Sequence, residues 1–186
     1  YRKFISKNLN NTINKYKFIV LRGPTGSAKT KIIEKLGKSD FPVLNLEKIA
    51  SHKGSLLGKD HNHPQPTQKY FESLIYFKLN NFKKNKSILI ESESSKIGNV
   101  FLPSMLLNRI ENSPSIDIRT SINARIDFLL NDYSKFIIKK NSFNKFFLYA
   151  KKKLGRKVVN GWELNYKKKE WRELASKLII EYYDPL

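Results

Sequence analysis

Hydrophobic residues follow two alternating patterns up to about residue 120. Short apolar runs with the length of buried strands lie at 17–22, 41–46, 87–90 and 115–119. Between these runs, apolar residues recur at helical spacing at 31–36, over 67–82, and in a helix that Pro103 opens. Strands that alternate with helices predict an α/β fold, in which a parallel sheet is flanked by helices.

The rest of the chain, from Ser121, is expected to be mostly helical. Its last amphipathic stripe consists of Trp171, Leu174, Leu178, Ile179 and Tyr182. Three regions are therefore predicted: a basic helical lead-in at 1–16, an α/β domain at 17–133, and a basic, mostly helical annex at 134–186. A long polar loop at 47–66 interrupts the α/β domain, and loops of that length usually serve a function.

The net charge changes this picture more than the overall composition does. The chain has 186 residues, of which 40% are hydrophobic, enough to form a buried core. It carries 36 Lys and Arg residues against 16 Asp and Glu, a formal net charge of +20. An excess of Lys and Asn is typical of compositional drift, but drift normally adds acidic residues as well. The charge therefore favours a polyanionic partner, most simply a nucleic acid.

Several classes of protein are excluded by what the sequence lacks. The chain has no Cys, which excludes thiol catalysis, disulfides and Cys-ligated metals within it. No apolar run approaches the roughly 18 residues that span a bilayer, and no amphipathic helix favours a membrane surface. We expect a cytoplasmic protein. Because the chain begins at Tyr1 and stops after Leu186, we also expect it to be a piece of a longer protein.

A phosphate-binding loop is predicted at Gly23-Pro24-Thr25-Gly26-Ser27-Ala28-Lys29-Thr30, which nearly fits the Walker A pattern G-x-x-x-x-G-K-[ST]. The loop follows an expected strand and precedes an expected helix, as the motif requires. Its backbone N–H groups would surround an anion, Lys29 would neutralise charge, and Thr30 would hold a metal. Ala28 replaces the second glycine. If the anion needs a close approach to the backbone at this point, the methyl group is expected to cost about 1 kcal/mol of anion binding.

Two acidic residues follow the strand predicted at 87–90. Glu91 stands where a P-loop protein has its second acidic motif, at the carboxyl end of a strand that neighbours the loop strand. It would hold a metal through water or act as a base. Glu93 is two residues further on and is expected to share the face of Glu91. Lys29, Glu91 and Glu93 are therefore predicted catalytic residues.

Five blocks of sequence occur in an order that is familiar from one family. They are Gly23–Thr30, then Leu46-Glu47-Lys48-Ile49-Ala50-Ser51-His52-Lys53-Gly54-Ser55-Leu56-Leu57-Gly58, then Gln65-Pro66-Thr67-Gln68 with Phe71-Glu72, then Glu91-x-Glu93-Ser94-x-Lys96-Ile97-Gly98, and finally Glu181-Tyr182-Tyr183-Asp184-Pro185-Leu186. Together they resemble the P-loop domain of bacterial tRNA 2-selenouridine synthase. The resemblance extends over essentially the whole chain.

The resemblance implies a P-loop NTPase-like fold and a two-stage modification of the wobble uridine of tRNA. In the first stage, geranyl diphosphate alkylates the sulfur of 2-thiouridine. In the second, selenium from selenophosphate replaces that group, a step associated with an upstream rhodanese domain and its cysteine. Because this chain has no Cys, we expect that domain to be missing here and selenation by this chain alone to be absent. Mg²⁺ is a candidate cofactor, and no resident metal site is predicted.

The resemblance also assigns roles within the long loop. His52 joins the predicted catalytic residues, and Lys53 and Ser55 join the predicted phosphate-binding residues. Gln65 and Gln68 either hydrogen-bond to a base edge or cap the next helix. This chain departs from the family pattern at Ala28, at Lys53, where arginine is usual, and at Asn45, where an acid is usual, and Asn45 weakens a role for a carboxylate there.

The basic annex is expected to contact the tRNA. Between Lys135 and Ile180 there are 14 Lys or Arg residues and 3 acidic residues. The predicted tRNA-binding residues are Gln65, Gln68, Lys96, Arg109, Arg156 and Lys157, with the lysine runs at 151–153 and 167–169 as further backbone contacts. Tyr166, Trp171, Tyr182 and Tyr183 either stack on bases or pack in a core, and their helical spacing favours the core.

Two other functions use the same residues. A small-molecule kinase or NTPase would have the same loop and Glu91, with Arg109, Arg119 and Arg125 forming a lid over a transferring phosphoryl group. A generic kinase has no need for the blocks at 52–55 and 65–68. A non-catalytic tRNA-binding module with a vestigial loop is the second alternative, and Ala28 favours it.

Overall fold

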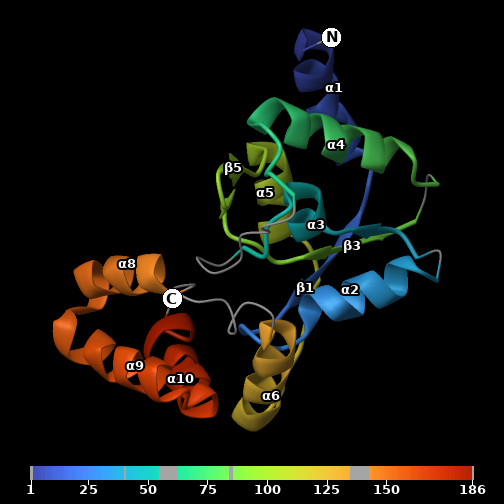
Figure 1. Ribbon diagram of the computed structural model, residues 1–186. Coiled ribbons are helices and arrows are strands. Elements are labelled where there is room, and N and C mark those ends of the chain that lie inside the picture. Colours follow the sequence, from blue (N-terminus) through green and yellow to red (C-terminus); the bar gives the residue numbers. More distant parts are fainter. Residues whose placement is uncertain (1, 40, 55–62, 84–85, 135–142, 186) are drawn as a thin grey trace. The chain divides into compact units, whose positions relative to one another are not determined.

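The computed structural model describes residues 2–39, 41–54, 63–83, 86–134 and 143–185. The chain divides into two compact units (Figure 1). The first, called the α/β unit, contains Tyr1–Arg22 and Lys29–Asp117. The second, called the helical unit, contains Gly23–Ala28 and Ile118–Leu186. No helix in the described part of the chain is both long and apolar enough to cross a bilayer.

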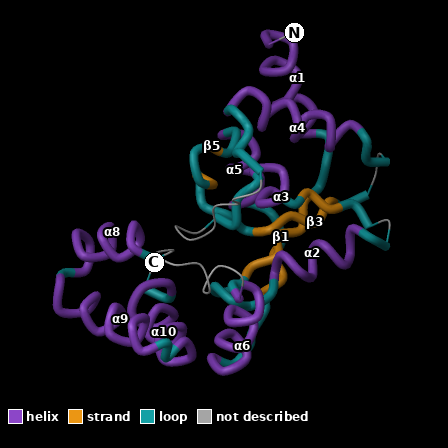
Figure 2. Tube along the Cα trace, in the orientation of Figure 1, coloured by secondary structure: helices purple, strands orange, loops and turns teal. Residues whose placement is uncertain are grey.

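Four parallel strands form the sheet of the α/β unit in the order β2–β3–β1–β6 (Figure 2). Their bounds are Phe18–Arg22 (β1), Val43–Leu44 (β2), Ile88–Glu91 (β3) and Ser115–Asp117 (β6). The register pairs Leu21 of β1 with Glu91 of β3, and Val20 of β1 with Ser115 of β6. The predicted α/β fold with a parallel sheet is confirmed.

Helices cover the two faces of this sheet unequally (Figure 1). On one face lie α1 (Arg2–Asn14), α3 (Leu46–Ala50), α4 (Gln68–Asn80) and α5 (Ser104–Glu111), and on the other lies α2 (Lys29–Gly37). A small antiparallel hairpin, β4 (Lys96–Ile97) and β5 (Val100–Phe101), precedes α5. The hydrophobic pattern did not predict this hairpin or α3, because each is too short to show a period.

The alternation of side chains along each strand explains this arrangement. Val20, Leu44 and Ile90 are fully buried in one cluster with Phe71 of α4 and Leu106 of α5. Residues next to them in the strands, such as Leu21 and Leu89, are buried on the opposite face, on the side of α2 and its fully buried Ile33.

The helical unit contains α6 (Ile122–Asp132), α8 (Asn144–Leu154), α9 (Arg156–Lys168), α10 (Trp171–Leu178) and a π-helical turn, η1 (Ile179–Tyr183). Aromatic side chains form its core. Trp162 is fully buried and stacks on Phe146 with 6.1 Å between ring centroids, and Tyr182 meets Phe146 edge-on at 5.3 Å. The rings of Tyr166 and Phe143 are tilted against each other, with 5.2 Å between their centroids. Tyr166 and Tyr182 therefore pack in the core, as their spacing favoured.

The boundary between the two units differs from the one predicted from the sequence. Ile126 of α6 packs with Ala175 and Ile179, so α6 belongs to the helical unit and the division follows Asp117 rather than residue 133. The predicted lead-in at 1–16 is the helix α1, whose Leu9 and Ile13 are buried in the core of the α/β unit. The helix α1 packs on α4 and α5, and burial of its apolar side chains stabilises this packing. It is therefore a structural part of the α/β unit.

Candidate active site

The carboxyl ends of the parallel strands meet at one edge of the sheet, the edge at which ligands bind in open α/β folds. Leu21 and Glu91 lie side by side there, and the N–H of Ser92 donates to the carbonyl of Leu21 at 3.0 Å. β3 thus ends beside β1, the strand that leads into the phosphate loop. The predicted position of Glu91, at the end of a strand next to the loop strand, is confirmed.

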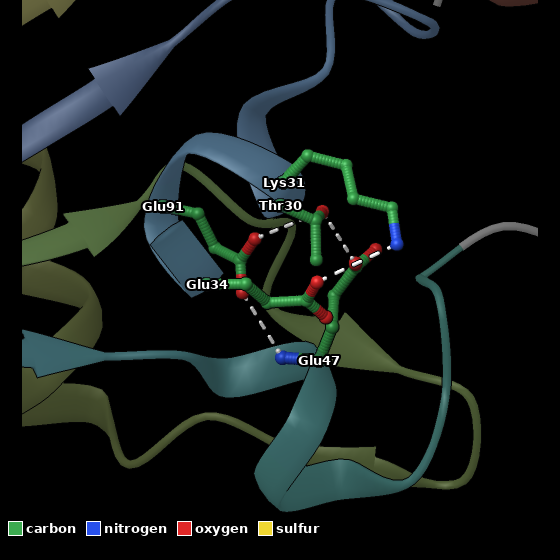
Figure 3. A network of polar contacts seen from close by, with 5 residues as sticks. All are labelled: Thr30, Lys31, Glu34, Glu47 and Glu91. Carbon is green, nitrogen blue, oxygen red and sulfur yellow. Dashed lines mark hydrogen bonds and ion pairs between the residues drawn. The ribbon is translucent and has the colours of Figure 1, made fainter. Parts of the chain in front are cut away.

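A network of polar contacts joins α2, α3 and β3 at this edge (Figure 3). The Thr30 hydroxyl donates to Oε2 of Glu47 at 2.8 Å and lies 3.4 Å from Oε2 of Glu91. The backbone N–H of Glu47 donates to Oε1 of Glu91 at 3.1 Å. We call Thr30, Glu47, Glu91 and Glu93 the acidic cluster. Lys31 and Glu34 pair at 3.5 Å on the exposed side of α2.

The short helix α3 places Glu47 in this network. Asn45 caps its N-terminus, accepting the N–H of Lys48 on Oδ1 at 2.7 Å. Leu46 and Ala50 anchor the helix in the core. Asn45 therefore serves as a helix cap, and the carboxylate of Glu47 contacts Thr30.

Burial raises the pKa values of two acidic residues in the cluster. Glu91 is fully buried, and its desolvation, together with the charge of Glu47, raises its pKa to about 7. Backbone N–H groups of Glu47 and Leu46 and the charge of Lys29 oppose this shift. Desolvation raises the pKa of Glu93 to about 8, with repulsion from Glu91 and Glu47 adding to it and Lys29 again opposing it. At neutral pH Glu93 therefore mostly holds its proton, whereas Glu91 is ionised in part.

The block at His52–Gly54 lies against the same carboxylates. The N–H of His52 donates to the carbonyl of Glu47 at 3.0 Å. Gly54 has a positive φ of 67°, and a Cβ there would lie 2.9 Å from Oε2 of Glu93 and 3.2 Å from Oε1 of Glu47. Only glycine fits this position without displacing a carboxylate. Lys53 is exposed.

The first six residues of the phosphate loop belong to the helical unit. Gly26 has a φ of 83°, and the N–H of Ser27 donates to the carbonyl of Pro24 at 3.1 Å. The Ser27 hydroxyl is buried, and among the described residues it has no hydrogen-bond partner. Ala28 has a φ of 62°, the left-handed conformation that glycine adopts without cost. The departure from glycine thus costs backbone strain, and its expected cost in anion binding stays a prediction.

Gln65 and Gln68 hold the β4–β5 hairpin in place. The Gln65 amide donates to the carbonyls of Ala50 and Ile97, both at 3.1 Å, and accepts the N–H of Asn99 at 2.9 Å. Gln68 donates to the carbonyl of Phe101 at 2.9 Å and accepts its N–H at 2.8 Å.

Neither glutamine caps α4, because Thr67 does, accepting the N–H of Tyr70 at 3.3 Å. The alternative in which one of these glutamines caps the next helix is therefore wrong. The side-chain amides that would read a base edge are already engaged within the protein.

The predicted arginines and lysines have different environments. Arg109 donates to the carbonyl of Tyr16 at 2.7 Å, which ties α5 to the end of α1. Lys96 is exposed, with its ammonium 5.1 Å from the centroid of the Phe101 ring. Arg156 and Lys157 are exposed in the first turn of α9.

Ser55, a predicted phosphate-binding residue, lies outside the described residues. Of the lid that a kinase would need, Arg109 and Arg125 donate to protein groups, and Arg119 is exposed.

The acidic cluster offers hydroxyl and carboxylate oxygens, the ligands that Mg²⁺ prefers. Within the described ranges, no group of three His, Cys, Asp or Glu side chains is arranged to hold a metal ion by itself. Thr30 and one or two of these carboxylates fit the usual partial shell of Mg²⁺, which water and substrate phosphates complete.

Sequence reasoning missed what two residues do. Glu47 lies in the second of the five family blocks, and its signal was its place three residues after the end of the short strand β2, at the carboxyl edge of the sheet. Arg125 is buried and donates to both the loop residue Thr25 and Asp184. The sequence had placed Arg125 only in the lid of the kinase alternative, and no pattern pointed to these contacts, because its partners are 100 and 59 residues away in the sequence.

Comparison with known proteins adds to this geometry. The family described as "tRNA 2-selenouridine synthase AAA domain" matches residues 16–160. Proteins named tRNA 2-selenouridine synthase are similar to the chain. The one from Nitrosomonas eutropha is 33% identical over 135 residues, covering 71% of this chain and 34% of its own length. The one from Shewanella piezotolerans is 29% identical over 216 residues, covering 100% of this chain and 57% of its own length. The chain thus spans between a third and three fifths of these relatives. No solved structure matches it.

Proposed function

The chain belongs to the tRNA 2-selenouridine synthase AAA domain family, and we propose that it binds geranyl diphosphate through Gly23–Thr30 and transfers the geranyl group to the sulfur of 2-thiouridine in tRNA. The observation that carries this proposal is the acidic cluster at the carboxyl edge of the sheet. It combines a loop threonine with two carboxyls whose pKa values are raised to about 7 and about 8, next to Lys29.

The phosphate loop supports the diphosphate half of the proposal. Lys29 begins α2, so the positive end of that helix and the ammonium group both favour an anion. The buried hydroxyl of Ser27 has its hydrogen-bonding capacity available for a phosphate oxygen. These groups would stabilise the diphosphate as negative charge accumulates on it in the transition state.

The transfer requires a place for one proton. The bond between the allylic carbon and the diphosphate oxygen breaks, a carbon–sulfur bond forms, and pyrophosphate leaves. The N3 proton of 2-thiouridine must also leave, so that the base becomes neutral again. Glu91, whose pKa is about 7, is ionised in part at neutral pH and accepts this proton. Glu93, whose pKa is about 8, stays protonated and keeps a second negative charge out of the cluster.

Mg²⁺, when bound, would be held by Thr30 and Glu47 and would supply positive charge to the leaving diphosphate.

The helical unit supports the tRNA half of the proposal. Lys145, Leu148, Tyr149 and Lys152 form one exposed stripe along α8, opposite its buried face. Tyr149 is 47% exposed, so its ring is available to stack on an unpaired base. Lys151 differs from its neighbours because it pairs with Glu163 at 2.6 Å.

Phosphate contacts from Lys145 and Lys152 make RNA binding depend on salt. We expect Lys152→Ala to weaken binding and to reduce the salt slope by about one. Lys151→Ala is the matched control, since its ammonium is already engaged by Glu163.

The proposal is tested by incubating the chain with geranyl diphosphate and a tRNA that contains 2-thiouridine, then digesting the tRNA and analysing its nucleosides by mass spectrometry. We expect a nucleoside carrying one geranyl group on sulfur, formed with release of pyrophosphate. Unmodified 2-thiouridine after prolonged incubation with Mg²⁺, in a sample that binds both substrates, would overturn the proposed reaction.

A further inference from the structure

A buried guanidinium connects the phosphate loop to the end of the chain within the helical unit. The Arg125 side chain of α6 is only 7% exposed. Its Nε donates to the carbonyl of Thr25 at 2.8 Å, and its Nη1 and Nη2 donate to the two carboxylate oxygens of Asp184 at 2.9 and 2.5 Å. One planar fork therefore engages the loop on one side and a carboxylate on the other.

The loop also rests directly on the backbone of this helix. A Cβ at Gly26 would lie 3.0 Å from the carbonyl oxygen of Arg125 and 3.1 Å from Cγ of Leu129. No side chain fits between the loop and α6 at this point. The Arg125 side chain thus holds Thr25, and Gly26 lies close to the Arg125 backbone.

The π-helical turn η1 places the Asp184 carboxylate within hydrogen-bond distance of Arg125. The N–H of Asp184 donates to the carbonyl of Ile179 at 2.9 Å, which closes the wide turn. Ile179 is fully buried against Ile126, one residue after Arg125. The core of the helical unit therefore fixes both partners of the ion pair.

Fixing the Thr25 carbonyl has a consequence for anion binding. In a trans peptide, the carbonyl of one residue and the N–H of the next point in opposite directions. When Arg125 holds the Thr25 carbonyl, the N–H of Gly26 is turned the other way, and a carbonyl that would repel phosphate is removed from the concave side of the loop. A loop without this constraint would lose part of its binding free energy to reorganisation.

We infer that Arg125 is a positioning residue for the phosphate loop, and that Asp184 holds Arg125 in place. The block at Glu181–Asp184 is thereby assigned a function in anion binding, although it lies at the opposite end of the sequence. The inference about affinity rests on the proposed diphosphate binding, whereas the inference about loop conformation does not.

The test compares Asp184→Asn with Asp127→Asn in the full chain. Asp127 accepts a hydrogen bond from Arg172 at the surface, and both of these side chains are more than half exposed. Each variant thus removes one carboxylate charge that is paired with an arginine of the helical unit. Only Asp184 pairs with Arg125, the arginine that donates to the loop. Hydrogen–deuterium exchange is measured for the peptide that covers residues 23–28 and for peptides of α8 and α9. Affinity for geranyl diphosphate is measured by calorimetry.

We expect Asp184→Asn to speed exchange in the loop peptide and to weaken diphosphate binding about tenfold, the loss that corresponds to a charged hydrogen bond. Exchange in α8 and α9 should stay as in the wild type, and Asp127→Asn should change none of these quantities. Arg125→Lys, which keeps the charge but cannot make all three bonds, should behave like Asp184→Asn.

Loop exchange and affinity equal to those of Asp127→Asn would overturn the inference, and so would faster exchange spread over α8 and α9, which indicates a purely stabilising pair. If the loop peptide alone exchanges faster but the wild type binds no diphosphate, the positioning role stands and the proposed function fails.

Discussion

The two units bury charge in opposite ways. In the α/β unit, Glu91 is fully buried with the carboxylates of Glu47 and Glu93 nearby, and its pKa rises to about 7. In the helical unit, the buried guanidinium of Arg125 donates to Asp184 and to Thr25. A buried group that is fully hydrogen-bonded supports architecture, whereas clustered like charges destabilise the fold and occur where chemistry needs them. In the proposed function, proton transfer therefore belongs to the α/β unit and loop positioning to the helical unit.

The largest expected effect follows from Glu91→Gln. Glutamine has the same shape and can still accept the N–H of Glu47, but it cannot take a proton. We expect geranyl transfer to fall at least about 100-fold, the contribution typical of a general base, while diphosphate affinity changes little. Steady-state rates and calorimetry measure the two quantities. Glu34→Gln, on the exposed side of α2, is the matched control and should be as active as the wild type. Full activity of Glu91→Gln would refute the assigned base.

The next largest effect is on how the free energy of unfolding depends on pH, and it follows from the raised pKa of Glu93. Its pKa is about 8 in the folded chain and near its ordinary value of 4.5 in the unfolded chain. Between these values the folded state holds a proton that the unfolded state has released, so stability falls as pH rises from 5 to 8. Glu93→Gln removes this loss, and we expect it to stabilise the chain by about 2 kcal/mol at pH 8.5 and hardly at all at pH 4.5.

Urea unfolding at both pH values measures this difference. Glu111→Gln is the control, because Glu111 is exposed at the end of α5. A stabilisation by Glu93→Gln that is equal at the two pH values would contradict the raised pKa.

A smaller effect is expected at Ala28, where the loop adopts a φ of 62°. Ala28→Gly removes the strain of a left-handed alanine, and the gain is reduced by the greater freedom of glycine in the unfolded chain. We expect a net stabilisation of about 1 kcal/mol, visible as a rise in the thermal midpoint. Diphosphate affinity should increase slightly or stay the same. A destabilised Ala28→Gly variant would show that the loop is not strained at this residue.

The smallest effect separates exposed from buried ion pairs. The pair between Arg172 and Asp127 is more than half exposed on both sides. We expect Arg172→Ala to change the free energy of unfolding by less than about 0.5 kcal/mol. Arg125→Ala should lose several times more free energy of unfolding. Urea unfolding of the two variants side by side measures this difference. Equal losses would remove the distinction between the two pairs.

The sequence predicted the sheet well because its strands are buried apolar runs bounded by turns. It also predicted Glu91, because a polar residue directly after such a strand stands at the ligand-binding edge. It did not single out Glu47, whose strand has only two residues and whose helix α3 has five. The contact between Arg125 and Asp184 was beyond any local pattern, since packing of α6 on α10 brings the two residues together.

Gln65 and Gln68 teach a related lesson. Their block was specific enough to indicate the family, but not to reveal what the side chains do. They bond to backbone groups of a hairpin whose strands are too short to predict. A specific motif can therefore report architecture around a site rather than contact with the substrate.

The most direct test of the central claim is titration calorimetry of the chain with geranyl diphosphate, ATP and GTP, repeated with Lys29→Ala. Burial of about ten prenyl carbons, at roughly 0.8 kcal/mol for each CH₂ as an upper bound, should separate the prenyl ligand clearly from the nucleotides. We expect geranyl diphosphate to bind tightly and Lys29→Ala to abolish that binding. Binding of ATP or GTP without a preference for the prenyl ligand would contradict the account and favour a kinase or NTPase.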